Sequence, residues 1–491
     1  MNSANILLIS QNVMLDSLAN VKEKFTADIP LVIVSTQLLF RNEREYITSI
    51  LGEFTAYTFA ELLTDSEMEQ CDTEAYLGNS EALQNYYARI KTLKNRLIIR
   101  KLDSMYECAA KIIVCDDLGI DASVWLEAGY EFVKCRYFHE EQPAPKLRSS
   151  IFRRISSFLR KSVYSAEYLG TKYVFYGLMH RIAYRMALDF KPDRTRNIYS
   201  LFSLVARKLT GITLQRRSKA IHISTLHEAG NLPMKALSGC KVRLIQDGYL
   251  PPNYSSLYLK FIPDNVVYYV WDVLGMQTFI NQNIPVELLP FRKKLYMPEI
   301  KPVKLRTVLI AASGAGDWTA VKNRSDDDKM LEAFGDIAAR FPDVKFIYRC
   351  HPTWVHPAHQ GVNSINRATE YFAYLNLPNL TISANIPHND INHFQLSFSR
   401  SSLDEDMNSA DIVFGEHSVS MIDAAMKGIP FASVNLTGRR NFFCGMTELG
   451  FPHCESIDEV IRILEECESS KFVEKFNSAV KRYNAMTDQE K

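Results

Sequence analysis

The sequence predicts an α/β protein made of two halves, each with a parallel β-sheet covered by helices. At 491 residues the chain is longer than a usual single domain, which favours two domains. Short, continuous apolar runs alternate along the chain with longer polar stretches that favour helix. Such runs are typical of parallel strands with both faces buried, because a strand with one exposed face would alternate apolar and polar residues.

The first half, residues 1–290, contains six of these apolar runs. Polar, helix-favouring stretches such as 66–100 lie between the early ones. Together they predict the first doubly wound domain. The expected strands are NILLIS (5–10), PLVIVST (30–36), KIIVCDD (111–117), AIHIST (220–225), KVRLI (241–245) and NVVYYVW (265–271).

The second half, residues 305–491, starts a new alternating series after a proline-punctuated stretch. That stretch, 291–304, is expected to be the linker between the two domains. In doubly wound sheets ligands bind beyond the carboxyl ends of the strands, so a site is expected in the cleft between the halves. The expected strands are RTVLIAAS (306–313), VKFIYRC (344–350), LTIS (380–383), DIVFG (411–415) and PFASVN (430–435).

The composition is typical of a globular protein, with 47% apolar and 23% charged residues and a formal net charge of +1. The nine cysteines form no CxxC pair, so a disulfide framework is not expected. The first residues have no basic flank before a short apolar run, which argues against an export signal. No apolar stretch of about 18 residues occurs. These features predict a cytoplasmic protein without a membrane-spanning helix.

Basic residues gather in one segment, 146–219, which holds 17 Lys and Arg against 3 Asp and Glu. At its start, Ile151, Ile155, Phe158 and Leu159 are spaced as on one helix, with arginines between them. This pattern suits the anionic headgroups of a membrane surface. The alternative is a solvated helical insertion that packs on its own domain. Nucleic acid is not an expected partner, because no motif for binding RNA or DNA occurs.

A histidine-proline element, YRCHPTWVHP (348–357), follows one expected strand of the second half. The proline forces the chain to turn, so Arg349, His351 and Pro352 would lie at the carboxyl edge of the sheet. His351 would then face the cleft, with Arg349 as its neighbour. The alternative is a strand-end histidine that bonds only to the backbone.

A loop of small residues, SGAGDW (313–318), follows the first strand of the second half. Residues such as Ser313 and Gly314 let the backbone approach a ligand closely, and the amide groups of such a loop can surround an anion. An ordinary tight turn between a strand and a helix explains this stretch equally well.

The strand expected at 411–415 ends and a helix begins at four polar residues, which are Glu416, His417, Ser418 and Ser420. Hydroxyls, an imidazole and the amide groups at the start of a helix suit a phosphate. Glu416 would repel phosphate but could accept hydrogen bonds from ribose hydroxyls. Helix capping alone would explain one of the two serines.

In the first half, KVRLIQDGYLPP places Asp247 directly after a strand, between Gln246 and Gly248. Across the cleft from a phosphate site, a carboxylate could be the base for an acceptor hydroxyl or a nucleophile at a sugar carbon. Asp-Gly is also a frequent turn dipeptide, so a plain turn is the alternative. Further candidates, from the end of another strand, are His227 and Glu228.

Metal binding is not expected. The sequence has no HExxH motif, no paired CxxC and no DxD flanked by apolar strands. The acids at 326–328 and 404–406 lie where helices are expected to begin, and compensation of the helix dipole explains them. No cofactor is therefore expected.

Taken together, these elements resemble the bacterial GT-B glycosyltransferases that use CMP-activated sugars, including transferases of Kdo and of sialic acids. The capsule-type Kdo transferases look most similar. They carry an acidic-Asp-Gly-aromatic-Leu element like QDGYL (246–250), in which Gln246 replaces the acid, and an HP element like CHP (350–352). They also carry a Ser-x-Ser-x-x-x-Ala-x-x-x-Gly-x-Pro run like SVSMIDAAMKGIP (418–430). The resemblance spans most of the chain but has no counterpart for 146–219.

The resemblance implies two Rossmann-like domains, an acceptor-side domain first and a CMP-sugar-binding domain second. It implies that His351 contacts the CMP phosphate, and that Ser418 and Ser420 hold the phosphate or the donor carboxylate. Asp247 would be the reactive carboxylate, a nucleophile in a retaining enzyme or a base in an inverting one.

By the same resemblance, Kdo or a related 2-keto-3-deoxy sugar acid would pass from CMP to a glycan or lipid-linked glycan. Such acceptors belong to lipopolysaccharide, O-antigen or capsule polysaccharide biosynthesis. The enzyme would need no metal and would lie on the cytoplasmic side of the inner membrane.

Other interpretations stay open at the level of sequence. The donor could be a CMP-sialic-acid-type sugar or a UDP-sugar, although the early glycine-rich loop expected for a UDP-sugar enzyme is not obvious. The chain could instead be a non-catalytic lipid- or nucleic-acid-binding protein that works through its basic segment.

Overall fold

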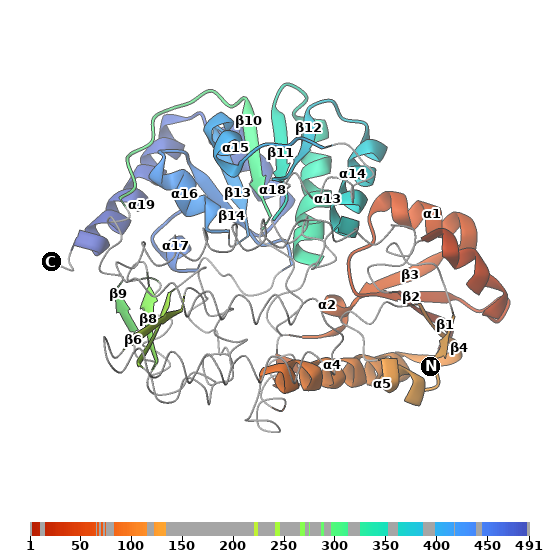
Figure 1. The fold of residues 1–491 in the computed structure, drawn as a ribbon. Helices are drawn as coiled ribbons and strands as arrows, with labels where there is room; N and C mark the ends of the chain where they lie inside the picture. The colour runs from red at the N-terminus through yellow and green to blue at the C-terminus, as the bar shows by residue number, and fades with distance from the viewer. Residues whose placement is uncertain are drawn as a thin grey trace, which may run out of the picture.

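The described part of the chain forms three parallel β-sheets, and described helices pack around the first and the third of them (Figure 1). The computed structural model describes residues 2–9, 15–64, 66–67, 70–71, 74, 83–114, 122–133, 220–223, 241–245, 266–270, 274, 286–288, 296–312, 325–351, 362–385, 398–416, 418–437 and 444–488.

The first sheet has five parallel strands in the order β3-β2-β1-β4-β5, which is the 3-2-1-4-5 order of a Rossmann-type unit. Its strands are β1 (Asn2–Ile9), β2 (Leu31–Ser35), β3 (Phe54–Thr58), β4 (Tyr106–Val114) and β5 (Glu131–Phe132). Its helical segments are the 3-10 helix η1 (Leu15–Lys24) and the α-helices α1 (Arg41–Leu51), α2 (Phe59–Leu62), α4 (Leu83–Met105) and α5 (Ala122–Glu127).

Strand β1 shows why this sheet is covered on both faces. Ile6 and Leu8 belong to one buried core, whereas Leu7 and Ile9 belong to a second core on the other side. Successive side chains of a strand point to opposite faces, so an unbroken apolar run requires two apolar layers. The prediction of a parallel sheet between helices is therefore confirmed.

A second sheet has four parallel strands in the order β6-β7-β8-β9. The strands are β6 (Ala220–Ile223), β7 (Lys241–Ile245), β8 (Val266–Val270) and β9 (Val286–Leu288). The range 1–290, expected to form one domain, thus holds two separate sheets among its described residues. Its boundaries stay a prediction, and the basic segment 146–219 lies outside the described residues.

The third sheet has six parallel strands in the order β12-β11-β10-β13-β14-β15, which is the 3-2-1-4-5-6 order of the Rossmann fold. Each of the five strands expected from the sequence in this half is present. The strands are β10 (Thr307–Ala311), β11 (Lys345–Arg349), β12 (Leu380–Ser383), β13 (Ile412–Gly415), β14 (Phe431–Val434) and β15 (His453–Cys454). The helices are α13 (Ser325–Arg340), α14 (Val362–Leu375), α15 (Leu403–Ser409), α16 (Ser420–Met426), α17 (Cys444–Glu448), α18 (Ile457–Glu466) and α19 (Ser470–Asp488).

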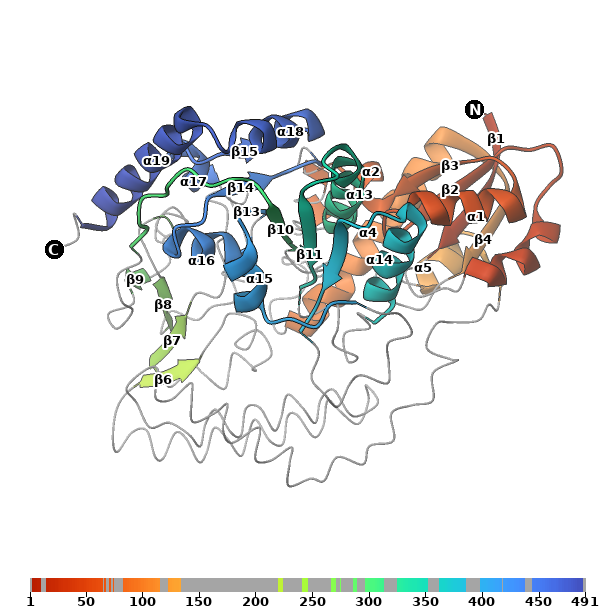
Figure 2. The ribbon, with the colours of Figure 1, turned by 90° about the horizontal axis from the view of Figure 1, so that it is seen from above.

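The extended chain before β10 is fastened along helix α19 (Figure 2). The Asn484 side chain accepts from the Met297 amide (3.1 Å) and donates to the Met297 carbonyl (2.8 Å). Asn477 makes the same pair of bonds with Ile300, at 2.8 and 3.0 Å. The extended chain and the helix run antiparallel. The two asparagines are seven positions apart, which is about 10.5 Å along the helix at 1.5 Å per residue. That matches the roughly 10 Å of three extended residues.

We expect Asn477→Ala to lower the free energy of unfolding by about 1–3 kcal/mol, because it leaves the buried Ile300 backbone without its two partners. Urea unfolding measures this loss. Lys475→Ala, at an exposed position of the same helix, is the control and should change the stability by less than about 0.5 kcal/mol. Equal midpoints for the two variants would show that the asparagine does not fasten the chain.

Candidate functional site

The carboxyl ends of the third sheet form one row across its edge. In the parallel register Ser383 lies beside Arg349, Arg349 beside Ala311, Ala311 beside Gly415, and Gly415 beside Ser433. Every residue that follows these positions therefore emerges at the same edge. This is the edge at which doubly wound sheets bind their ligands.

The strand order reverses between β10 and β13, and this switch point is closely packed. A Cβ added to Gly415 would lie 3.1 Å from the Ala311 carbonyl oxygen and 3.4 Å from the Met421 sulfur. A side chain there would meet backbone, which cannot move aside as a flexible side chain can. Glycine therefore lets the chain turn from β13 toward α16 directly against β10.

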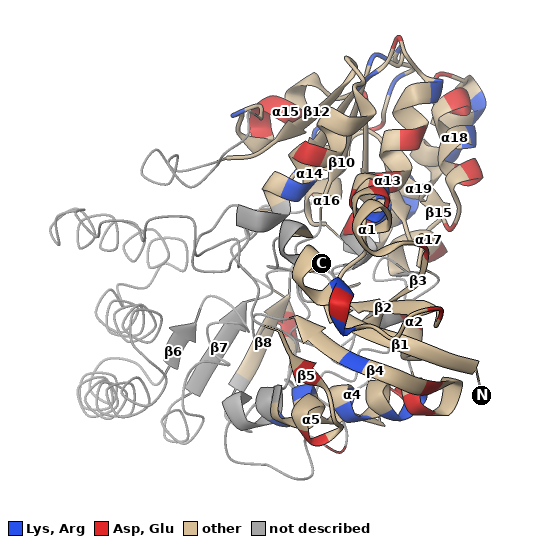
Figure 3. Ribbon diagram, turned by 90° about the vertical axis from the view of Figure 1, so that its right-hand side faces the viewer, with Lys and Arg blue, Asp and Glu red and all other residues tan. Residues whose placement is uncertain are grey.

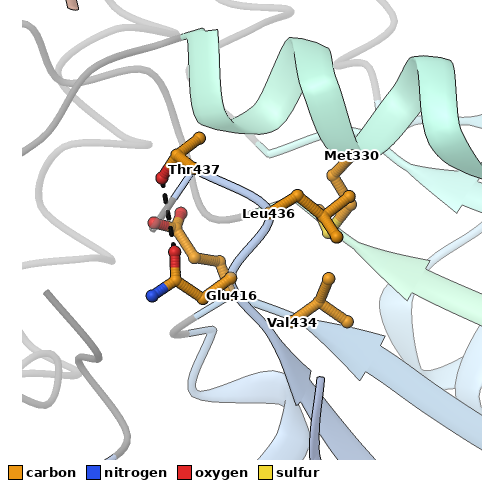
Figure 4. Close-up of a pocket in the computed structure, with 6 residues that line it drawn as sticks. Met330, Glu416, Val434, Leu436 and Thr437 are labelled. Atoms are coloured by element: carbon orange, nitrogen blue, oxygen red, sulfur yellow. Dashed lines mark hydrogen bonds between the residues drawn. The ribbon is translucent and has the colours of Figure 1, made fainter. Parts of the chain in front are cut away.

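A pocket lies next to this turn, between the start of α13 and the ends of β13 and β14 (Figure 4). It is a small hollow, because its space of about 200 Å³ includes the open solvent at its mouth. The lining residues are Met330, Glu416, Val434, Asn435, Leu436 and Thr437.

The lining of this pocket is divided into an apolar and a polar side. Figure 4 shows the side chains of Met330, Val434 and Leu436 on one side and the polar ends of Glu416 and Thr437 on the other. The Thr437 hydroxyl donates to the Asn435 side-chain oxygen at 3.3 Å. A carboxylate, an amide and a hydroxyl beside an apolar wall suit a ring that carries hydroxyl or amino groups.

Asn435, Thr437 and Met330 were not among the residues singled out in the sequence. Asn435 ends the expected strand at 430–435 and Thr437 follows it, so polar residues at this strand end were a signal of the same kind as Glu416. Met330 reaches the pocket from α13, and nothing in its local sequence indicates this position.

The two serines of the β13–α16 turn are held together. The Ser418 hydroxyl donates to the Ser420 hydroxyl at 3.0 Å and accepts from the Ser420 amide at 3.3 Å. Helix α16 starts at Ser420, and its N-cap, Val419, forms no side-chain cap. The bond from the Ser420 amide to the Ser418 hydroxyl is nevertheless of the capping type, so capping stays an explanation for one of the two serines. The pair presents two hydroxyls, one turn of chain away from Glu416.

Arg349 lies in a buried polar network below the edge. Its Nη1 donates to the Ser383 hydroxyl (2.9 Å) and to the Asp406 carboxylate (3.0 Å), and also to the Ser401 carbonyl. Arg349 is 8% exposed and Asp406 5%. The bonds of this nitrogen point into the protein. Substrate binding by the other nitrogens of the Arg349 guanidinium stays a prediction.

The same network revises the interpretation of the acids at 404–406. Asp406 also accepts hydrogen bonds from the Ser383 and Ser401 hydroxyls. Compensation of the helix dipole is therefore an incomplete explanation for Asp406. Glu405 keeps a local role, because it forms a capping box with Ser402 at the start of α15.

His351 follows Arg349 by two residues at the carboxyl edge and is half-buried. The backbone before it is fixed, since the Cys350 amide donates to the Ser383 carbonyl at 2.9 Å. One strand, β10, lies between β11 and β13. At about 4.8 Å per strand, the ends that carry His351 and Glu416 are roughly 10 Å apart.

The structure thus brings Glu416, Ser418 and Ser420 into one turn and places His351 and Arg349 two strands away. The other candidates lie outside the described residues, and their roles stay predictions. They are Asp247, Gln246, Gly248, His227, Glu228, Ser313, Gly314, Pro352 and His417.

Within the described ranges, no group of three or more His, Cys, Asp or Glu side chains is arranged to hold a metal ion. Among the helices that the structure describes, none combines the length and the apolar character needed to cross a membrane.

Comparison with known proteins adds little to these observations. No protein-family model and no curated protein sequence matches the chain. The crystal structure of UDP-GlcNAc 2-epimerase from Neisseria meningitidis bound to UDP-GlcNAc aligns with 99% of this chain and 100% of that one. The sequences are 10% identical and the TM-score is 0.23. At this score the likeness carries no argument, so the α/β class rests on the strand order seen directly.

Proposed function

We propose that the carboxyl edge of the third sheet binds the nucleotide of an activated sugar and that the chain is a GT-B-type glycosyltransferase. One observation carries the proposal. Glu416 lines a small pocket at the switch point of the sheet, and Ser418 and Ser420 follow in the same turn. The carboxylate accepts hydrogen bonds from ribose or base donors. The Ser420 hydroxyl accepts the proton of Ser418 and has its own proton to donate to a phosphate.

The separation of the two strand ends supports this assignment. A nucleotide whose ring lies beside Glu416 would extend its phosphate along the edge, toward the β11 end with His351. The distance of roughly 10 Å between these strand ends is comparable to the length of a nucleoside monophosphate. His351 would then contact the phosphate from the side opposite the serine pair.

We infer the donor from the sequence resemblance. It is Kdo, or a related 2-keto-3-deoxy sugar acid, activated as its CMP derivative, and the acceptor is a surface-polysaccharide or lipid-linked glycan. CMP-sialic-type sugars and UDP-sugars are the alternative donors. The basic segment 146–219 would hold the enzyme at an anionic membrane surface, where lipid-linked acceptors lie.

The proposed reaction breaks the bond between the anomeric carbon and the CMP phosphate oxygen. In a retaining enzyme the Asp247 carboxylate attacks this carbon, and an acceptor hydroxyl then displaces the carboxylate and loses its proton to solvent or a base. In an inverting enzyme Asp247 instead takes the proton of the acceptor hydroxyl as it attacks. CMP leaves as a phosphate, so stabilisation of charge matters more than acid catalysis.

A nucleotide screen by thermal shift tests the proposal. Ligand at 100 times its dissociation constant stabilises the folded state by about 2.7 kcal/mol, which raises the melting temperature by several degrees. We expect CMP to stabilise the protein more than UMP, UDP or GDP. Selective stabilisation by UDP would indicate a UDP-sugar donor instead of a CMP-sugar donor. No response to any nucleotide would exclude the proposed site.

The pocket can be tested in the same screen. Glu416→Gln should reduce the CMP shift, because the amide keeps one acceptor but loses the charge that strengthens the hydrogen bonds. Glu465→Gln, an exposed position on α18, serves as the matched control and should leave the shift unchanged.

A further inference from the structure

Helix α1 of the first sheet's unit is docked on helices α13 and α14 of the third sheet's unit. Figures 1 and 2 both place α1 beside α14, and Figure 3 shows acidic and basic residues along α1 and α13 where they meet. The two sides come from chain segments about 300 residues apart. Their contact is therefore a tertiary interface that decides how the two units face each other.

A buried ion pair stands at the centre of this interface. The Glu43 carboxylate accepts from Nε and Nη2 of Arg367 at 2.5 and 2.6 Å, and each residue is 6% exposed. A fork of two parallel bonds fixes orientation as well as distance. The Arg367 Nη1 lies 3.6 Å from Asp328, which is also buried. Burial opposes the charge on Arg367, but Glu43 and then Asp328 outweigh it and raise its pKa above the usual value.

Both partners of this ion pair also bind the backbone of the β2–α1 connection. Glu43 accepts from the Phe40 amide at 2.8 Å and so closes the first turn of α1. Arg367 Nη2 donates to the Leu38 carbonyl at 2.7 Å. One arginine from α14 thus holds both the connection and the first turn of the helix that follows it.

Phe40 completes the junction by entering the other unit. It is 1% exposed and belongs to the same buried core as the strands of the third sheet. Its ring stacks on Tyr371 with centroids 4.9 Å apart, and the Arg367 guanidinium lies 4.7 Å from its centre. The ion pair is therefore enclosed by packed rings, which fixes its geometry further.

Ion pairs nearer the surface surround this centre. Arg41 bonds Asp336 at 2.9 Å, and Arg44 lies 3.6 Å from Glu332. Exposed pairs of this kind contribute little individually. Among the ion pairs described at this interface, the buried Glu43–Arg367 pair is thus the one whose loss should disturb the docking most.

The junction lies at the carboxyl edges of both sheets. The β2–α1 connection leaves the carboxyl end of β2, and Asp328 is in the first turn of α13, after the carboxyl end of β10. A reaction that joins a nucleotide on the third sheet to an acceptor held at the carboxyl edge of the first sheet depends on how these edges are held.

We propose that Glu43 and Arg367 are positioning residues that clamp the first unit against the third sheet and so align the two sides of the active site. This inference rests on the proposed glycosyl transfer. It assigns the pair no contact with the substrate, so it predicts an effect on transfer that is separate from nucleotide binding.

The test compares Arg367→Lys with Arg41→Lys in the full chain. Lysine keeps the charge but cannot form the two-bond fork. We expect Arg367→Lys to lower the rate of transfer from the CMP-sugar to the glycan acceptor at least tenfold, while CMP affinity by calorimetry stays within twofold. Arg41→Lys, in the exposed pair of the same interface, should keep both within twofold. A transfer rate within twofold for Arg367→Lys, or an equal loss of CMP affinity, would overturn the positioning role.

A double-mutant cycle measured by unfolding tests the clamp without an activity assay. Glu43→Gln and Arg367→Met are combined, because glutamine can still accept from the Phe40 amide. We expect the pair to be coupled by at least tenfold in the unfolding equilibrium constant, and coupling below twofold would refute the clamp. If the unchanged protein binds no nucleotide, the proposed function fails while this cycle still decides the clamp. Should Arg367→Lys not fold, Glu43→Gln takes its place in the transfer assay with the same expected outcome.

Discussion

Asp406→Ala is expected to lower the free energy of unfolding by about 3–5 kcal/mol, because it leaves the Arg349 guanidinium buried without its counter-charge. The substitution also removes the acceptor for the Ser383 and Ser401 hydroxyls. These partners join the ends of β11 and β12 to the start of α15, so the loss should reach the whole carboxyl edge. Urea unfolding, followed by circular dichroism, measures the difference.

Asp404→Ala is the matched control, because Asp404 stands two residues earlier in the same helix. Its side chain is 83% exposed and pairs with Lys427 at 2.9 Å. An exposed pair contributes about 0–1 kcal/mol. Similar losses for the two variants would mean that the buried network does not stabilise this edge. Replacing both buried partners, as Arg349→Met with Asp406→Leu, should cost much less than Asp406→Ala, since no uncompensated charge remains.

Much of the fold could be predicted because its main strands are buried on both faces. Apolar runs as short as those of β10 and β13, bounded by turn residues, favour strands that are buried on both faces. Strands without such a run were missed. Strand β3 has two exposed residues in its middle, and β5 and β15 have two residues each. The order of the strands could not be predicted either, because periodicity shows burial and not pairing.

The candidate site was predictable to the extent that it follows strand ends. Glu416, Ser418 and Ser420 were found because a polar cluster directly follows an apolar strand. Asn435 reaches the same pocket from the next strand of the sheet, and a single sequence shows no link between them. The position of Arg349 was predicted but its partner was not, since Asp406 is 57 residues away. Contacts across such separations depend on the tertiary fold.

The Glu43–Arg367 clamp shows even more clearly that contacts between distant segments could not be predicted from the sequence. Glu43 is a typical first-turn acid, and its capping bond to Phe40 could be expected from its position in α1. Nothing local indicates that the other face of its carboxylate meets Arg367, 324 residues further on. Phe40 likewise reads as an ordinary apolar residue at the start of a helix, although it belongs to the core of the other unit.

Asp247→Ala is expected to lower the rate of sugar transfer by about a thousandfold or more while CMP affinity stays within a few fold. A positioned base contributes roughly 10²–10⁴ to a rate, and loss of a nucleophile removes the covalent route altogether. The proposed nucleotide contacts come from the third sheet, so a residue of the first half should not affect binding. Transfer to the acceptor and calorimetry with CMP measure the two quantities separately.

His351→Ala is compared with Asp247→Ala, because we expect it to lower the affinity for CMP rather than to remove the reactive group. Loss of a phosphate contact should weaken CMP binding, whereas the reactive carboxylate stays in place. Unchanged turnover in Asp247→Ala would show that this residue takes no part in the reaction, and the proposal for the nucleotide site would be unaffected.

The anomeric configuration of the product, read by NMR, separates the two proposed roles of Asp247, since a covalent intermediate gives retention and a base gives inversion. A loss of transfer in one variant and of affinity in the other would require a site built from both halves of the chain.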